Sequence, residues 1–249
     1  MSIIRDISRG PAAGSLPPEP ANDRAAAMTN DTRNSVLPAN FVAELFGSAR
    51  PVTLARNKTL FLAGDACDGC YRVVDGLLKV TAAAPSNRER ILAILGPGAL
   101  VGELSLIDGA PRSASVTAIR DARLAFVTRA AFEIFAEANP QVYRDISALL
   151  ARHIRDNNNA LVATSFLSVK GRAARALLNL AEAFGENVGS GRILIHQKVS
   201  QGDLAAMAGI ARENLSRILQ EWMRSGLIKR LASYYCVENK AALEHEADN

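Results

Sequence analysis

The chain has 249 residues, of which 49% are hydrophobic and 22% are charged. This composition is typical of a soluble globular protein, and the length suits one large domain or two modest ones. The formal net charge of +4 permits nucleic-acid binding without requiring it. No segment approaches the roughly 18 consecutive apolar residues of a transmembrane helix, and the N-terminus lacks the order of a signal peptide. We therefore expect a cytoplasmic protein that does not bind to or span a membrane.

Residues 1–37 are rich in proline, alanine, asparagine, aspartate and arginine, and their prolines cluster at Pro11, Pro17, Pro18 and Pro20. No apolar periodicity is sustained there, so burial of apolar side chains cannot offset the entropy lost on ordering the segment. We predict a disordered arm over residues 1–37.

Short apolar runs separated by turn signals occupy roughly residues 41–127. The runs are residues 60–62, 71–74, 77–80, 91–95 and 115–118, with turn signals at 64–65, 75–76, 85–87 and 96–98. Many short strands at this spacing are typical of an antiparallel barrel or sandwich. Within this region the strand-and-turn segment GELSLIDGAPRSASV, residues 102–116, carries one carboxylate near its start, Glu103, and one guanidinium, Arg112, among mostly small or apolar residues.

Cys67 and Cys70 have the spacing of half a redox or metal site. A thiolate cluster needs four ligands, and the remaining cysteine, Cys236, lies far along the chain. We favour the alternative that these are incidental cysteines in a turn, and we expect no metal site and no prosthetic group.

The sequence turns helical after the strand region. A short helix over residues 132–138 ends at Asn139-Pro140, where proline suits the start of the next helix. Beyond it, five residues follow one another at alternating intervals of four and three positions: Leu150, Ile154, Asn157, Leu161 and Thr164. This a/d seam is typical of a helix that pairs with a copy of itself, and a polar Asn157 within it can fix the register. The alternative is a helix that lies on its own domain.

The next part of the chain is predicted to contain a helical region over residues 171–184, a glycine-rich turn and a short strand at 192–196. It is followed by the segment QGDLAAMAGIARENLSRILQ, residues 201–220. The segment has the pattern of a helix-turn-helix. Ala205 is small enough for two helices to cross, and Gly209 tolerates the positive φ of the turn. Ser200 is the expected N-cap and Asp203 lies in the first turn. The residues expected to anchor both helices to a core are Leu204, Met207, Ile210, Leu215, Ile218 and Leu219.

The second helix of this motif presents polar side chains near its N-terminus, where they would reach base edges. Arginine can pair bidentately with guanine, and glutamate can accept a hydrogen bond from cytosine N4. Residues 226–230 and 234–237 are typical of a winged hairpin that contacts phosphates. A helix pair with solvated charges is the alternative. The residues assigned to DNA binding are Ser200, Gln201, Arg212, Glu213, Asn214, Ser216, Arg217, Lys229 and Arg230.

These features in this order resemble the CRP/FNR family of bacterial transcription regulators over roughly residues 38–238. GELSLIDGAPRSASV resembles the phosphate-binding cassette of cyclic-nucleotide-binding domains, and Arg212-Glu213 with Arg217 resembles the family's recognition helix. The resemblance implies an α+β chain: the arm at 1–37, a cyclic-nucleotide-binding β-roll at 38–137, a dimerisation helix at 138–167 and a winged helix-turn-helix domain at 168–249.

The resemblance also implies roles for individual residues. Glu103 would accept the ribose 2′-hydroxyl, and Arg112 would pair with the cyclic phosphate. Ser113 and the backbone N–H groups beside it would complete the anion pocket. Asn157 and Asn158 stand where the catabolite activator protein reads the base with a Thr-Ser pair, and an asparagine can both donate and accept. The implied ligand-binding set is Gly102, Glu103, Leu104, Arg112, Ser113, Ala114, Asn157 and Asn158.

The implied function is that of a homodimeric regulator, not an enzyme, that binds double-stranded DNA at a near-palindromic, TGTGA-like operator in response to cAMP or cGMP. RNA polymerase is a further candidate partner. The alternatives are a relative that needs no ligand or senses another effector, an enzyme with a regulatory nucleotide domain, and a structural dimer. His153 is interpreted as a flanking polar residue rather than a haem ligand. The target genes and the direction of regulation stay open.

Overall fold

The computed structural model describes residues 38–83 and 89–248, apart from the side chains of residues 39, 40, 83 and 164. The arm predicted at residues 1–37, the turn predicted at 85–87 and the side chain of Thr164 therefore lie outside the described residues. Within this description, no helix is both long enough and apolar enough to cross a membrane.

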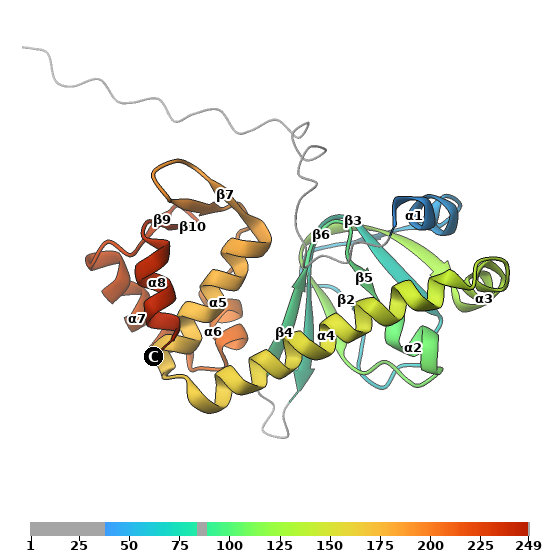
Figure 1. The fold of residues 1–249 in the computed structure, drawn as a ribbon, viewed down its shortest axis with the longest axis horizontal. Coiled ribbons are helices and arrows are strands. Elements are labelled where there is room, and N and C mark those ends of the chain that lie inside the picture. The colour runs from blue at the N-terminus through green and yellow to red at the C-terminus, as the bar shows by residue number, and fades with distance from the viewer. Residues whose placement is uncertain (1–37, 84–88, 249) are drawn as a thin grey trace, which may run out of the picture. The chain divides into compact units, whose positions relative to one another are not determined.

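An antiparallel sheet forms the N-terminal half of the described chain (Figure 1). Its strands are β1 (Arg50–Leu54), β2 (Thr59–Phe61), β3 (Gly69–Ala83), β4 (Glu89–Leu95), β5 (Leu100–Val101) and β6 (Ser115–Thr128). They are ordered β1-β6-β3-β4, with β2 on β6 and β5 on β3. Along β6 the side chains of Val116, Ala118, Ala122 and Leu124 are buried, and they pack in one core with Tyr71 of β3. The predicted antiparallel β domain is confirmed.

Two local predictions in this half are wrong. Asp75-Gly76 is no turn between strands: both residues lie inside the single strand β3, where the pairing with β6 shifts register around them. Gly76 has a φ of 97°, and a Cβ there would lie 2.4 Å from the carbonyl oxygen of Asp121. A glycine in a β-bulge with close backbone contact explains the turn-like signal. The segment after Gly102 is also no plain strand and turn, because α2 (Glu103–Asp108) is helical.

Three more helices accompany the sheet: α1 (Ala39–Phe46), α3 (Arg129–Ala138) and α4 (Gln141–Phe166). Helix α3 ends and α4 begins at the predicted Asn139-Pro140 boundary. Figure 1 shows α1 and α3 near one another beside the sheet. Phe41, Phe132 and Val142 share one buried cluster, to which the start of α4 contributes. Further along α4 the apolar side chains emerge: Ile154 is 60% exposed, Leu161 66% and Phe166 81%. The first half of α4 thus packs on the sheet domain, while its second half presents unburied apolar groups.

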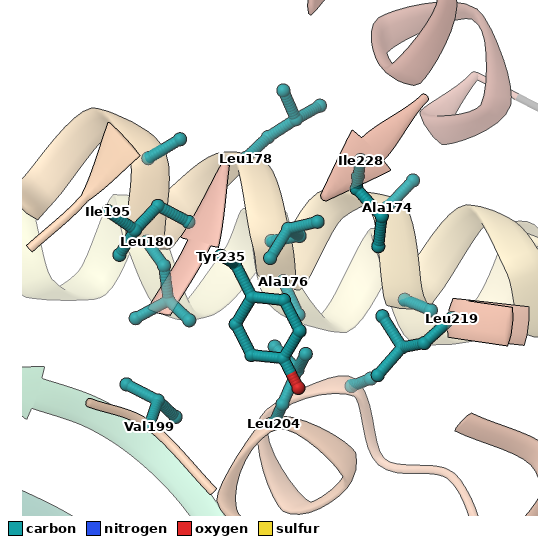
Figure 2. Packing of buried hydrophobic residues seen from close by; sticks show 14 of the residues in the cluster. Ala174, Ala176, Leu178, Leu180, Ile195, Val199, Leu204, Leu219, Ile228 and Tyr235 are labelled. Carbon is teal, nitrogen blue, oxygen red and sulfur yellow. The ribbon is translucent and has the colours of Figure 1, made fainter. Parts of the chain in front are cut away.

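The C-terminal half is a winged helix-turn-helix. Its elements are α5 (Val169–Phe184), β7 (Gly185–Asn187), β8 (Ile193–Ile195), α6 (Gln201–Ala208), α7 (Arg212–Arg224), β9 (Ile228–Leu231), β10 (Tyr234–Val237) and α8 (Lys240–Ala247). The strands pair in the order β7-β8-β10-β9. Figure 2 shows the ring of Tyr235 among Ala176 and Leu204, with Ile195 and Leu219 in the same cluster. Leu215, Ile218 and Leu219 are buried as predicted.

Gly209 ends α6 in the left-handed region, with φ 64° and ψ 38°. A Cβ there would meet nothing closer than 3.9 Å, so the cost of Gly209→Ala is that of the backbone conformation, about 1 kcal/mol. Gly202 has ordinary helical surroundings, with Ser200 Oγ 3.6 Å from an added Cβ. Gly202→Ala should therefore stabilise the protein by about 0.5–1 kcal/mol.

Thermal melting of the two glycine variants measures this difference. Gly209→Ala is expected to lower Tm by a few degrees and Gly202→Ala to raise it. Equal shifts in the same direction would contradict the left-handed turn between α6 and α7.

Candidate ligand pocket and DNA-binding surface

The segment around α2 brings two distant ends of the cassette together. Gly102 precedes α2 with φ 85° and Gly109 follows it with φ 69°, a conformation that glycine adopts without strain. A Cβ on Gly102 would lie 2.3 Å from Nη1 of Arg112. Glycine is therefore needed at position 102 both for the turn and for the guanidinium to approach the backbone.

The Arg112 side chain is only 1% exposed. Its Nη1 donates to the carbonyl of Gly102 at 2.9 Å, and its Nη2 donates to the carbonyl of Gly69 at 2.7 Å and to Asp68 Oδ1 at 2.6 Å. The guanidinium carbon also lies 4.3 Å from the centroid of the Phe61 ring. These contacts offset part of the cost of burying a charge.

One donor of this guanidinium stays unsatisfied: among the described residues, the buried Nε of Arg112 has no hydrogen-bond partner. A buried donor without an acceptor costs about 1–3 kcal/mol. Arginine presents Nε–H and an Nη–H as a planar fork that matches two oxygens of a phosphate. An incoming anion would therefore relieve a cost that the protein alone leaves in place.

The backbone also fastens this segment to the turn that precedes β3. Arg112 N–H donates to the carbonyl of Asp65 at 2.8 Å, and Gly64 N–H donates to the carbonyl of Arg112 at 2.8 Å. Ala63 N–H donates to Ser115 Oγ at 2.9 Å. Arg112 is thus held by main-chain bonds as well as by its side chain, so its position is set before any ligand arrives.

The other predicted cassette residues differ in burial. Glu103 is buried, as the first residue of α2, and its Oε1 lies 3.3 Å from Nδ1 of His153 on α4. Ala114 is buried and Ser113 is exposed beside Arg112. Leu104 is 40% exposed. The structure therefore brings Glu103, Gly102 and Arg112 to one locality, with Ser113 at its surface.

The residues predicted to read the base are not joined to this locality. Asn157 and Asn158 are exposed on α4, and across the described part of the chain no hydrogen bond or ion pair links either to Glu103 or Arg112. Sequence reasoning also missed Asp68, the Gly69 carbonyl and the Phe61 ring as partners of Arg112. The one sequence feature that could have indicated these three partners is their position near the predicted turn at 64–65.

Cys70 lies beside this locality and is buried. Burial, reinforced by the nearby charge of Glu103, raises the pKa of the Cys70 thiol to about 12. The thiol therefore stays protonated at neutral pH, and a protonated thiol is a poor nucleophile and a poor metal ligand. In the described ranges no group of three or more histidine, cysteine or acidic residues is arranged to hold a metal ion.

The second helix of the motif, α7, separates a buried face from a polar one. Leu215, Ile218, Leu219 and Trp222 are buried, which fixes the rotation of α7 about its axis. Consequently the exposed positions at its N-terminus are Arg212, Glu213 and Arg217, with Asn214 and Ser216 half-buried beside them. Arg217 Nη2 donates to Asn214 Oδ1 within this set.

The remaining predicted DNA contacts lie at the first helix and the wing. Ser200 caps α6 by accepting from Asp203 N–H at 3.0 Å, and Gln201 is the first residue of α6. Lys229 and Arg230 are exposed on β9, which pairs with β10 in the hairpin. A helix N-terminus and a basic hairpin are both suited to phosphate contacts.

Two family models match the chain. The Cyclic nucleotide-binding domain matches residues 51–139 and the Crp-like helix-turn-helix domain matches residues 171–246. A CRP-like cAMP-activated global transcriptional regulator of Mycobacterium tuberculosis is 33% identical over 188 residues, covering 76% of this chain and 84% of that protein. The cyclic AMP receptor protein of Thermus thermophilus is 33% identical over 192 residues, covering 77% and 85%.

Solved structures show the same fold. FixK2 from Bradyrhizobium japonicum has a TM-score of 0.71 at 21% identity, covering 79% of this chain and 96% of that one. CLP of Xanthomonas campestris, described as a c-di-GMP responsive global regulator, has a TM-score of 0.67 at 21% identity, covering 80% and 98%. With a cyclic-nucleotide-binding domain before a Crp-like helix-turn-helix, this chain belongs to the CRP/FNR family of DNA-binding transcription regulators.

Proposed function

We propose that the protein is a homodimeric regulator that binds a cyclic nucleotide, with cAMP as the first candidate and cGMP as the second. The observation that carries the proposal is the buried guanidinium of Arg112, whose Nε lacks a partner among the described residues. The two relatives at 33% identity are named for cAMP, which favours that nucleotide. In this proposal the protein is a regulator rather than an enzyme.

The two ends of the pocket suit the two ends of the ligand's sugar-phosphate ring. Arg112 would pair with the cyclic phosphate through Nε–H and the parallel Nη2–H, with the phosphate taking the place of the Asp68 carboxylate that Nη2 now contacts. Glu103 would accept the ribose 2′-hydroxyl, and Ser113 would add a donor beside the phosphate. Gly102, Leu104 and Ala114 would shape the pocket wall, and Asn157 or Asn158 would read the base.

The DNA-binding half would read an operator through α7. Arg212, Glu213 and Arg217 would contact base edges, with Asn214 and Ser216 beside them. Ser200, Gln201, Lys229 and Arg230 would contact phosphates and fix the register. A two-fold symmetric dimer requires a near-palindromic site with half-sites roughly 34 Å apart, and a TGTGA-like half-site is proposed from the family resemblance.

The dimer would form along the second half of α4, within the proposed dimerisation segment 138–167 that separates a sensor domain at 38–137 from a DNA-binding domain at 168–249. Ile154 and Leu161 belong to the predicted seam and are 60% and 66% exposed. An apolar stripe of this kind on a helix is typical of a coiled-coil partner surface.

Leu161→Asp is expected to convert the dimer to a monomer, because two aspartates would face each other across the seam without a counter-charge. Sedimentation velocity at micromolar concentration measures the change, with Arg144→Asp, an exposed position at the start of α4, as the control that stays dimeric. A monomeric wild type, or a dimeric Leu161→Asp variant, would contradict the α4 interface.

A second candidate is a family member that responds to another effector. It is favoured by the position of Asn157 and Asn158, which the structure does not join to Glu103 or Arg112. Calorimetric titration of the purified full-length chain with cAMP, with cGMP and with c-di-GMP separates the candidates. Saturable binding of cAMP supports the first proposal, whereas binding of c-di-GMP alone supports the second.

A further inference from the structure

Helix α4 reaches the candidate pocket through a histidine. The imidazole Nδ1 of His153 lies 3.3 Å from Oε1 of Glu103, and the two side chains are 35% and 11% exposed. His153 belongs to α4, whereas Glu103 is the first residue of α2. The contact therefore joins the cassette to a helix that comes 50 residues later in the chain.

We propose that His153 is a positioning residue for the sugar end of the pocket: its imidazole holds the Glu103 carboxylate where it accepts a ribose 2′-hydroxyl. This inference rests on the proposed function, since it takes a cyclic nucleotide as the ligand. It gives His153 a role that the sequence, read alone, did not suggest.

Burial of the Glu103 carboxylate has an energetic cost. A carboxylate removed from water needs a donor or a positive charge nearby, and Nδ1 of His153 is placed at ion-pair distance from one of its two oxygens. A protonated imidazole supplies both a donor and a charge, and a neutral one with its proton on Nδ1 still supplies the donor. With Oε1 engaged in this way, Oε2 is left for the ligand.

Fixing the carboxylate beforehand also lowers the entropic cost of binding. A free glutamate side chain loses about 1–2 kcal/mol of rotamer entropy when it is immobilised. Because His153 would immobilise this side chain before the ligand arrives, that entropy is not lost on binding. The gain appears only for a ligand that contacts Glu103, that is, one with a 2′-hydroxyl.

The position of His153 on α4 gives this contact a second consequence. Asn157 lies four residues further, about 6 Å along the helix axis and on a neighbouring part of the same face. Ile154, the next residue after His153, is an exposed member of the predicted seam. A ligand that engages Glu103 therefore acts, through His153, on the helix that carries both the base-reading candidates and the dimer seam.

Calorimetry with two ligands tests the role of His153. Wild type, His153→Ala and His153→Gln are titrated with cAMP and with 2′-deoxy-cAMP, which lacks the hydroxyl. The control is Arg155→Ala, an exposed residue two positions along α4 and thus about 200° around the helix from His153. Circular dichroism melting verifies that each variant is folded.

His153→Ala is expected to weaken cAMP binding about 10-fold, the loss of one hydrogen bond to a charged group. The same variant should change 2′-deoxy-cAMP binding by less than about 2-fold, and glutamine, which keeps an N–H donor, should restore most of the cAMP affinity. Equal losses for both ligands, or no loss for cAMP, would overturn the inference while leaving the proposed function intact. A folded wild type that binds no cyclic nucleotide would overturn both.

Discussion

Arg112→Ala is expected to lower the affinity for cAMP by at least about 100-fold, so that cAMP no longer stimulates operator binding. Two charge-assisted hydrogen bonds to a phosphate contribute about 1.5 kcal/mol each or more, which corresponds to roughly this factor. The buried Nε of Arg112, which has no acceptor among the described residues, is the donor that the phosphate would satisfy.

Folding must be separated from binding in this variant, because alanine also leaves the carbonyls of Gly69 and Gly102 without the donors they now have. Arg112→Lys keeps the charge but lacks the planar fork, so we expect it to fold and still to lose about 10-fold or more in affinity. Arg123→Ala removes an arginine of the same domain whose side chain is 69% exposed, and its affinity should equal that of wild type.

Direct titration of cAMP into each purified variant, with a melting curve for each, measures these effects. A folded Arg112→Ala protein that binds cAMP as wild type does would show that the cassette is not the phosphate site.

Glu213→Ala is expected to weaken binding to the operator without weakening binding to non-specific DNA. Loss of one base contact costs about 1–3 kcal/mol, and a symmetric dimer loses it in both half-sites, so operator affinity should fall about 30-fold or more. Binding to non-specific DNA should stay equal or strengthen, because a carboxylate that repels phosphates is removed.

The matched control for Glu213→Ala is Glu221→Ala on the same helix. Glu221 is exposed and pairs with Lys170 of α5. It lies eight residues after Glu213, about 12 Å further along α7, so its loss should change both DNA affinities little. Fluorescence anisotropy at one fixed salt concentration, with operator and scrambled duplexes, gives the six affinities of wild type and the two variants. Equal weakening on both duplexes would show that Glu213 contributes charge rather than base readout.

The parts of the fold that follow a strict local pattern were predictable from sequence. The helix-turn-helix needs a small residue at the crossing, a left-handed turn residue and an apolar face, and Ala205, Gly209 and Leu215 meet these needs wherever the rest of the chain lies. The boundary at Asn139-Pro140 is equally local, since proline suits only the start of a helix.

Features that depend on contacts across the sheet were not predictable. Asp75-Gly76 has the composition of a turn, yet Gly76 serves a bulge because β6 approaches it closely. The partners of Arg112 illustrate the same limit. Asp68 and the Gly69 carbonyl come together with it through the pairing of β3 with β5 and β6 and through the main-chain bonds from Arg112 to residues 64 and 65. No periodicity of the sequence records these contacts.

His153 is a site residue that the sequence did not indicate, although the helix that carries it, α4, was predicted. The seam pattern places it beside the dimer face of α4, and nothing in that pattern points toward the cassette. Its contact with Glu103 arises because the first half of α4 packs against the sheet domain through Val142, Ile146 and Leu149. Packing of that half decides which later side chain reaches the pocket.

In the proposed function, a cyclic nucleotide in the pocket strengthens operator binding by this chain. The most direct measurement is the affinity of the wild-type protein for the duplex that it selects from a random pool, with and without saturating cAMP, at one salt concentration. We predict that cAMP raises the affinity at least about 10-fold, a coupling of the size usual between two sites. Equal operator affinities with and without either cAMP or cGMP would show that a cyclic nucleotide is not the effector of this protein.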